Sequence, residues 1–426
     1  MRKKAENAAV NKPQKKGEFR KLFHVGSIDA IFCCFVLILF GFGLVMMYSA
    51  SYAYAGAHAS STSYYFKRQL FWGILGFIAM FIVSRVDYRI LNSWFTPYVI
   101  IPVSVLFMIV AMVVNRGESI KRWIQIGPVS FQPSELMKFV VVLTMAYVIC
   151  ILSDTLKAEK NKCVTPKRSR LTKPEKIIYY FVDTPAKSGV FMLVVVGMFT
   201  LLVLAGKHLS GAILVCLIGI SMMWVGGAPK WLMGVIGACA VVAVAVVVLK
   251  PEALKLFSDY AYERVAVWKA KATVGKTTYW QTWQGLLAIG SGGPFGLGFG
   301  NSKQKLLYVP EPQNDYVFSI VCEELGFVGA LIVLLLFAML IVRGFMIAAK
   351  TTDYFGALLV IGIMMQVGLQ VVLNIAVVTD TIPNTGVPFP FFSYGGSALF
   401  ILLCEMGVVL SVSRRSYLDK EKERVI

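Results

Sequence analysis

The sequence is poor in charge and in the residues that most often carry metal or acid–base chemistry. Only 15% of its 426 residues are charged, against 57% that are hydrophobic, and the mean hydropathy is +0.70. Such a composition excludes an ordinary soluble domain. Histidine is limited to His24, His58 and His208, none of which lies near a nucleophile motif or a metal-ligand pattern. The 8 cysteines show no CxxC spacing, so we infer neither disulfides nor a zinc site.

Long apolar runs, in contrast, are abundant, and several are long enough to cross a bilayer, which takes about 20 residues each. They do not alternate with a period of two, which excludes an outer-membrane barrel. The first run leads to no small-residue cleavage site, so we expect no removable signal peptide. We predict an all-α polytopic membrane protein with about ten transmembrane helices, with apolar windows near residues 30–49, 69–84, 97–114, 133–152, 189–206, 210–225, 230–249, 316–342, 354–378 and 395–412.

Acidic residues are few compared with basic ones. The sequence has 23 Asp and Glu and 42 Lys and Arg, which gives a formal net charge of +19. The basic residues lie mostly between the apolar windows. We therefore interpret the charge as a topology signal and as contacts with anionic lipids, and we expect no nucleic-acid partner. The leader 1–26, the connection 153–188 and the tail 413–426 are basic, which places both termini in the cytoplasm. Residues 27–412 then form a single transmembrane domain.

Two connections, 115–132 and 250–315, fall on the outer side in this topology. The second is large and contains an aromatic, glycine-rich stretch at 279–300, which we expect to lie in the outer interface or to fold back onto the helices. Its glycines match neither of the common nucleotide-binding patterns. The connection ends at Asp315, which therefore faces outward at the mouth of the eighth span.

Asp315 directly precedes an apolar run, where a carboxylate either caps the helix or has a function. Basic residues are numerous in both outer connections, where they either remain solvated beside lipid headgroups or hold a phosphate or pyrophosphate. A functional Asp315 would take a proton from an attacking hydroxyl while the cations stabilise a departing phosphate. The residue types alone leave both alternatives open.

Ionisable residues also occur inside the apolar windows. Glu135 and Lys138 begin the fourth window, where they form either a structural ion pair or part of a ligand site. Glu323 and Glu324 lie about two turns into the eighth. The stretch 381–396, TIPNTGVPFPFFSYGG, contains prolines that cannot support a regular helix, so we expect a re-entrant or cavity-lining segment.

Three blocks of sequence stand out by their composition: RWIQIGPVSFQPSELMKF (122–139), AIGSGGPFGLGFGNSKQKLLYVPEPQNDYVFSIVCEELGFVG (288–329) and TGVPFPFFSYGGSALF (385–400). In order and spacing they resemble the signatures of the shape, elongation, division and sporulation (SEDS) family, from the first span to the last. The resemblance implies a ten-helix membrane glycosyltransferase that polymerises lipid II into peptidoglycan strands. The stretches VMMYSASYAYA and KHLSGAIL are more similar to the division branch, FtsW, than to RodA or SpoVE.

Within this resemblance, Asp315 matches the essential acidic residue of the family and Trp123 matches its loop tryptophan. Asp315 is then expected to deprotonate the acceptor 4-hydroxyl in an inverting transfer, with undecaprenyl pyrophosphate as the leaving group. The chain differs from some FtsW proteins at two positions. Leu307 stands where they carry an acidic residue, and Thr385 stands where they carry a lysine. The expected substrate-binding residues are Arg122, Trp123, Lys138, Arg264, Lys305 and Ser393.

The resemblance also implies partners and a location. The partners are lipid II, a class B penicillin-binding protein that supplies the transpeptidase, and other division proteins, at the bacterial cytoplasmic membrane. No cofactor is indicated and no metal ligands are expected, although a divalent cation stays open. A lipid II flippase that uses the buried glutamates, and a non-catalytic division scaffold, are the alternative functions.

Overall fold

The computed structural model describes residues 27–59, 61–114, 123–127, 129–153, 182–256, 259–270 and 277–425. Within these ranges the chain is mainly helical, with one two-stranded hairpin. The elements are, in order, α1 (Ala30–His58), α2 (Tyr64–Arg85), η3 (Tyr88–Asn92), η4 (Thr96–Ile100), α3 (Ile101–Val114), β1 (Ile124–Ile126), β2 (Val129–Phe131), α4 (Pro133–Ile151), α6 (Pro185–Ala205), α7 (Leu209–Val225), α8 (Lys230–Leu249), η6 (Pro251–Leu256), α9 (Asp259–Ala270), α10 (Thr277–Ser291), α11 (Val317–Lys350), α12 (Tyr354–Val378) and α13 (Gly396–Val425).

The apolar runs form the expected helices. In the described part of the chain, 9 helices are long and apolar enough to cross a membrane, with η4 and α3 counted as one. Helix α7 is also apolar but has only 17 residues. These helices coincide with the predicted windows, which confirms an all-α, multi-pass membrane fold. The helix is favoured because it satisfies every backbone polar group without water.

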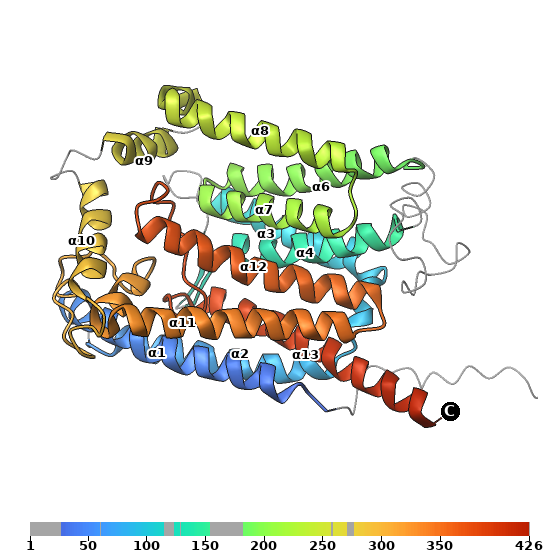
Figure 1. Cartoon of the computed structure of the whole chain (residues 1–426), viewed down its shortest axis with the longest axis horizontal. Coiled ribbons are helices and arrows are strands. Elements are labelled where there is room, and N and C mark those ends of the chain that lie inside the picture. The colour runs from blue at the N-terminus through green and yellow to red at the C-terminus, as the bar shows by residue number, and fades with distance from the viewer. Residues whose placement is uncertain are drawn as a thin grey trace, which may run out of the picture.

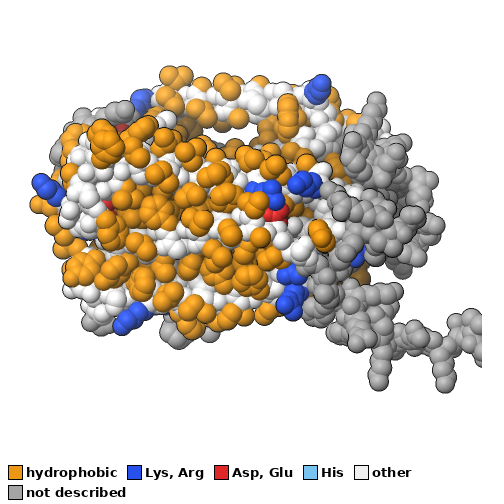
Figure 2. Space-filling model, turned by 60° about the horizontal axis from the view of Figure 1, so that its bottom comes forward, with side chains coloured by type: hydrophobic (Ala, Val, Ile, Leu, Met, Phe, Trp, Pro, Cys, Tyr) orange, Lys and Arg blue, Asp and Glu red, His pale blue; other side chains and the backbone are white. Residues whose placement is uncertain are grey.

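The spanning helices lie side by side along the long axis of the molecule (Figure 1). Their burial differs greatly, since 83% of the apolar window of α4 is buried inside the protein but only 6% of that of α8. Helix α4 is thus central, whereas α8 lies at one edge (Figure 1). Figure 2 shows a broad field of hydrophobic side chains on one face, with Lys and Arg mainly toward its ends, as expected for a lipid-facing belt.

The long connection between α8 and α11 contains η6, α9 and α10, and α10 packs against α11. The glycine-rich stretch after α10 lies directly on the α11 backbone. A Cβ on Gly292 would lie 2.0 Å from the carbonyl oxygen of Cys322, and one on Gly296 would lie 2.2 Å from that of Glu324. Only glycine permits so close an approach. The stretch therefore lies on the helices, which is one of the two placements expected from the sequence.

Helix α11 is interrupted near its start by Gly326, whose φ of 66° and ψ of −168° are not helical. The amide of Phe327 donates to the carbonyl of Gly293 at 2.9 Å instead of to its own helix. Glu323 and Glu324 precede this kink. They therefore belong to a short helical segment that is bound to the long connection, rather than to the long apolar part of the span.

The connection between α12 and α13, residues 379–395, forms no helix, as its prolines predict. Phe389 is buried and packs against Phe337 of α11, with ring centroids 5.1 Å apart. The amide of Tyr394 donates to the carbonyl of Gln313 at 2.8 Å. This is non-helical backbone whose polar groups find partners inside the protein, which is the condition for such a segment at membrane depth.

Candidate active site

A cavity of about 610 Å³ is lined in part by α9 and α10, two helices that lie at one end of the bundle (Figure 1). Its walls come from α2, the β1–β2 hairpin, the starts of α4 and α7, α9, α10 and the connections that precede α11 and α13. Among the residues expected from the sequence, the structure brings Asp315, Trp123 and Arg264 to this cavity. A carboxylate, a cation and an aromatic ring from three distant parts of the chain thus share one site.

Asp315 is held through its backbone carbonyl by a side chain of α12. The amide Nδ2 of Asn374, in α12, donates to the carbonyl oxygens of both Asp315 and Val387, at 2.8 and 2.7 Å. Gly386 lies so close that a Cβ there would be 3.0 Å from Asp315 Oδ2, and its φ is 73°. The N-cap residue of α11 is Tyr316, so Asp315 does not have the capping position that was the alternative to a function.

Arg264 projects from α9 into the same cavity. Its Nη1 donates to the carbonyl oxygen of Asn384 at 3.0 Å, and the Asn384 amide reaches Gln281 Oε1 of α10 at 3.3 Å. The charges of Asp315 and Arg264 both lie near enough to Tyr316 to act on its hydroxyl. The guanidinium is therefore anchored in the wall of the cavity that Asp315 also lines, where it can bind an anionic group.

Trp123 directly precedes the hairpin, whose register pairs Gln125 with Ser130. Trp123, Gln125 and Ser130 all line the cavity. The hairpin is anchored at Phe131, whose ring packs edge-on against Phe107 of α3 at 5.7 Å between centroids. This anchor allows a short two-stranded element to hold the half-buried Trp123 ring in the cavity wall.

Sequence analysis missed a second cation, Arg68 of α2, which lines the cavity together with Trp72 and Tyr394. Arg68 Nη1 donates to the hydroxyl of Tyr64 at 2.6 Å. Planar guanidinium and aromatic groups suit phosphates and the apolar faces of sugar rings. The available signal was the position of Arg68 at the predicted outer end of the second span, among the aromatic residues of SYYFKRQLFW.

His208 also lines the cavity. It was given no role from the sequence because it lies in no histidine motif. Its Nδ1 lies 2.7 Å from the hydroxyl of Ser134 and 3.4 Å from Nε2 of Gln132, so it joins the start of α7 to the start of α4. Among the described residues, no group of three or more His, Cys, Asp and Glu is placed to hold a metal ion. The described residues therefore offer no such set of ligands for a divalent cation.

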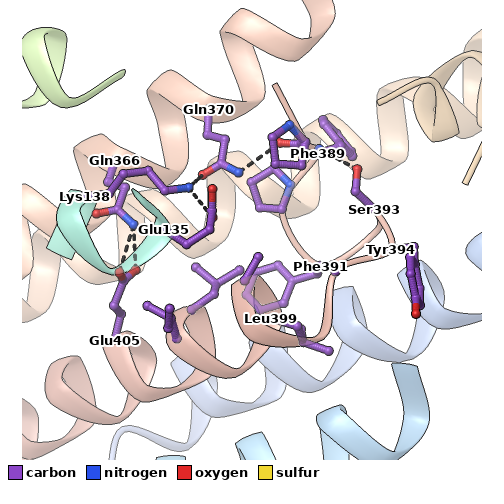
Figure 3. A pocket seen from close by; sticks show the side chains of 16 residues that line it. Glu135, Lys138, Gln366, Gln370, Phe389, Phe391, Ser393, Tyr394, Leu399 and Glu405 are labelled. Atoms are coloured by element: carbon purple, nitrogen blue, oxygen red, sulfur yellow. Dashed lines mark hydrogen bonds and ion pairs between the residues drawn. The ribbon is translucent and has the colours of Figure 1, made fainter. Parts of the chain in front are cut away.

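Lys138 and Ser393 lie in a smaller pocket next to the large cavity (Figure 3). Lys138 Nζ binds Glu135 Oε2 at 2.6 Å and Gln370 Oε1 at 3.2 Å. The structural ion pair considered for Glu135 and Lys138 is therefore present. The Ser393 hydroxyl accepts a hydrogen bond from the amide of Phe389 at 2.7 Å, so it shapes its own loop.

Lys305 is not brought to the cavity. It is buried, and its Nζ binds Glu324 Oε1 at 2.7 Å, the Ser49 hydroxyl at 2.9 Å and the Gly300 carbonyl at 2.8 Å. These partners occupy the three donors of its ammonium. Arg122, the remaining predicted cation, lies outside the described residues.

The chain matches, over residues 29–418, the sequence model of the cell cycle protein family that comprises FtsW, RodA and SpoVE. It belongs to this family. The match confirms the resemblance to the SEDS proteins. It also agrees with the observation that the family's three signature blocks converge on one cavity.

Relatives of the FtsW/RodA/SpoVE family span nearly the whole chain. Stage V sporulation protein E of Bacillus subtilis (strain 168) is 34% identical over 397 residues, which cover 92% of this chain and 98% of that protein. A probable peptidoglycan glycosyltransferase FtsW of Geobacter sp. (strain M18) is 31% identical over 398 residues, with coverage of 92% and 98%.

Solved structures agree with the fold. Rod shape determining protein RodA of Thermus thermophilus superposes with a TM-score of 0.59 at 26% identity, and the match covers 92% of this chain and 98% of that one. A chain from a peptidoglycan synthase complex that coordinates polymerization and crosslinking gives a TM-score of 0.67 at 26% identity, with coverage of 92% and 99%.

Proposed function

We propose that this chain is a peptidoglycan glycosyltransferase that polymerises lipid II at the large cavity. The observation that carries the proposal is the presence of Asp315 and Arg264 in the wall of one cavity, in a chain of the FtsW/RodA/SpoVE family. A polymerase of this kind needs a base for the acceptor hydroxyl and a cation for the leaving pyrophosphate. The cavity supplies both groups, and the hydrophobic outer surface of the bundle suits a lipid-linked substrate.

The roles of the described residues follow from their positions, and that of Arg122, which lies outside them, from the resemblance to the family. Asp315 takes the proton of the acceptor 4-hydroxyl, whose oxygen attacks the anomeric carbon on the face opposite the pyrophosphate, so the configuration inverts. Arg264 and Arg68, together with Arg122, stabilise the charge on the departing undecaprenyl pyrophosphate. Trp123 forms part of the wall that orients the sugars.

The other predicted residues support this site indirectly. Lys138 pairs with Glu135 within α4 and donates to Gln370, which links the start of α4 to α12, and Ser393 fixes the loop that carries Tyr394 into the cavity. We assign Lys305 a structural role instead of a substrate contact, because its ammonium is bound to Glu324.

The cellular role that we propose is cell division, with elongation or sporulation as the alternatives within the family. The partner is a class B penicillin-binding protein, and other division proteins join the assembly. The solved synthase complex, which couples polymerization with crosslinking, supports such a partner. The expected location is the bacterial cytoplasmic membrane with both termini in the cytoplasm, as the basic tails favour.

The test is the polymerisation rate of the purified chain with its cognate transpeptidase, with lipid II as substrate. Asp315→Asn keeps the shape of the side chain but removes the base, so it should abolish polymer formation while folding and partner binding persist. Glu311→Gln is the matched control, because Glu311 is a second carboxylate in the same cavity. Polymerisation by the Asp315→Asn protein at a near wild-type rate would refute the assignment.

Translocation of lipid II is the rival function. Two of the buried groups that suggested it, Glu323 and Glu324, bind the long connection: Glu323 accepts from the amide of Lys303 at 2.9 Å, and Glu324 pairs with Lys305. Proteoliposomes that contain only this chain can separate the two functions. Transport of labelled lipid II that is unaffected by Asp315→Asn, without polymer, would favour translocation.

A further inference from the structure

A second pocket, of about 30 Å³, lies next to the large cavity in the centre of the bundle (Figure 3). It is formed by α4, α12, α13 and the segment before α13. The two spaces are neighbours, because Glu135 and Tyr394 line both. The charged side chains of its lining are Glu135, Lys138 and Glu405.

The charges in this lining do not balance. The ammonium of Lys138 is bound to Glu135 at 2.6 Å. Glu405, which is 1% exposed, receives its two hydrogen bonds from one amide nitrogen, Nε2 of Gln366, at 2.9 and 2.8 Å. An amide donates hydrogen bonds but carries no charge, so among the described residues of this lining two carboxyl groups face a single ammonium. Uncompensated charge at this depth is strongly unfavourable.

Gln366 provides an independent observation at the same place. Its side chain is 2% exposed and lines the pocket, and its Oε1 has no hydrogen-bond partner among the described residues. Buried acceptors are normally satisfied. An acceptor without a donor, next to these carboxyl groups, is a place where a small positive ligand can bind, and a pocket of about 30 Å³ has room for one water-sized particle.

We propose that Glu405, Gln366 and Glu135 form a binding site for one monovalent metal cation of about the size of sodium. Carboxylate and amide oxygens are the ligands that hard cations prefer. A single positive charge balances the second carboxylate. Magnesium fits poorly, because it usually keeps several of its waters and the pocket is too small for them.

The site has a consequence for the neighbouring cavity. Glu405 and Lys138 line the same pocket, where their opposite charges attract. A bound cation offsets this attraction, so Lys138 stays on Glu135 and Gln370, and α4 keeps its contact with α12. Gln370 in turn donates to the carbonyl of Pro388, in the wall of the large cavity, at 2.9 Å. The cation is therefore a stabilising ligand of the bundle that also supports the active-site wall.

The test uses the full-length chain with its transpeptidase partner in detergent, at constant ionic strength, while choline chloride is replaced stepwise by sodium chloride. The midpoint of thermal unfolding should rise saturably by at least about 2 °C in the wild type, because a ligand of the folded state stabilises it. Potassium should give a smaller rise. Glu405→Gln should remove the response, and Cys404→Ala, on the same helix but outside the pocket lining, should retain it.

Gln366→Met, which keeps the volume but removes the orphan oxygen, serves as a second variant in case Glu405→Gln does not fold. A wild-type midpoint that does not respond to sodium, or a response that survives in both variants, overturns the proposal. A midpoint that ignores sodium but depends on pH through Glu405 overturns it as well, because a proton then balances the charge. The readout does not require polymerisation, so it stays informative even if the proposed function fails.

Discussion

Lys305 and Arg264 are both basic residues of the long connection between α8 and α11, but the structure places them in different surroundings. Lys305 is 5% exposed and is bound by Glu324, Ser49 and a backbone carbonyl. Arg264 donates from Nη1 to one backbone carbonyl and lines an open cavity that it shares with Asp315. The two cations therefore differ in what surrounds them, because protein groups enclose Lys305 whereas Arg264 faces a cavity.

The difference separates a structural charge from a functional one. A buried ion pair with all its partners holds two segments together and is expensive to break, but it has no donor left for a substrate. A cation in a cavity wall faces the space that a ligand would occupy, so its removal should change chemistry more than stability. Variants of the two residues should therefore give opposite patterns of stability and rate.

The largest expected effect on stability is that of Lys305→Met. It leaves Glu324 buried without its cation, and such a break costs about 3–5 kcal/mol. Thermal unfolding of the purified protein measures the loss. The protein that remains folded should polymerise lipid II at a near wild-type rate per molecule.

The double variant Lys305→Met/Glu324→Met is the control, because replacing both charges by apolar groups should recover much of the stability. A Lys305→Met protein that is stable but inactive would return Lys305 to the substrate-binding role expected from the sequence.

Arg264→Gln should show the opposite pattern. The loss of one preorganised cation at a developing negative charge typically slows a reaction by about 100-fold or more. The unfolding midpoint should change little, since Arg264 lies at the cavity surface rather than in the core. Initial polymerisation rates at saturating lipid II, with Arg264→Lys as the charge-keeping control, measure the effect. Equal rates for Arg264→Gln and wild type would show that Arg264 does not stabilise the leaving pyrophosphate.

Trp123 tests whether the aromatic part of the wall also acts on the chemistry. If Trp123 orders the hairpin over Asp315, Trp123→Ala should slow turnover by up to about 100-fold, and Trp123→Phe by less, because misplacement by about 1 Å is expensive. The measurement is the initial rate at matched protein stability. Wild-type rates for both variants would reduce Trp123 to an interfacial anchor.

The same contrast explains what the sequence could and could not predict. The spanning helices were predictable because a continuous run of apolar residues indicates each of them. The non-helical segment at 381–396 was predictable from its prolines. The presence of Asp315 in the cavity wall was predictable from its position and its motif, and its catalytic role stays a prediction. Lys305 could not be assigned, because its partner Glu324 is set by the kink at Gly326 and by backbone contacts that no local pattern encodes.

The surroundings of Arg68 and Glu405 could not be predicted from the sequence either. Both are single charged residues in or beside apolar windows, and their meaning depends on which helices pack against α2 and α13. Periodicity indicates that a helix spans the membrane but not which neighbour it faces. Only the packing places Arg68 opposite the long connection and Glu405 beside Gln366.

The smallest expected effect lies at the other end of α11, where a buried carboxylate has partial compensation. Asp353, between α11 and α12, accepts a hydrogen bond from the Tyr88 hydroxyl at 3.0 Å, and Arg89 Nε lies 3.9 Å away. Burial nevertheless raises the pKa of Asp353 above its ordinary value, because these partners do not fully replace water.

A carboxyl group whose pKa is higher in the folded state binds its proton more tightly there than in the unfolded chain. Its contribution to stability is complete below the unfolded pKa, about 3.9, and is lost as the pH rises through the folded pKa. Asp353→Asn should remove this dependence. The wild-type midpoint should therefore fall relative to that of Asp353→Asn as the pH is raised from about 4. Thermal unfolding of both proteins across this pH range measures the difference, and parallel curves would show that Tyr88 and Arg89 compensate Asp353 fully, as Glu324 and Ser49 do for Lys305.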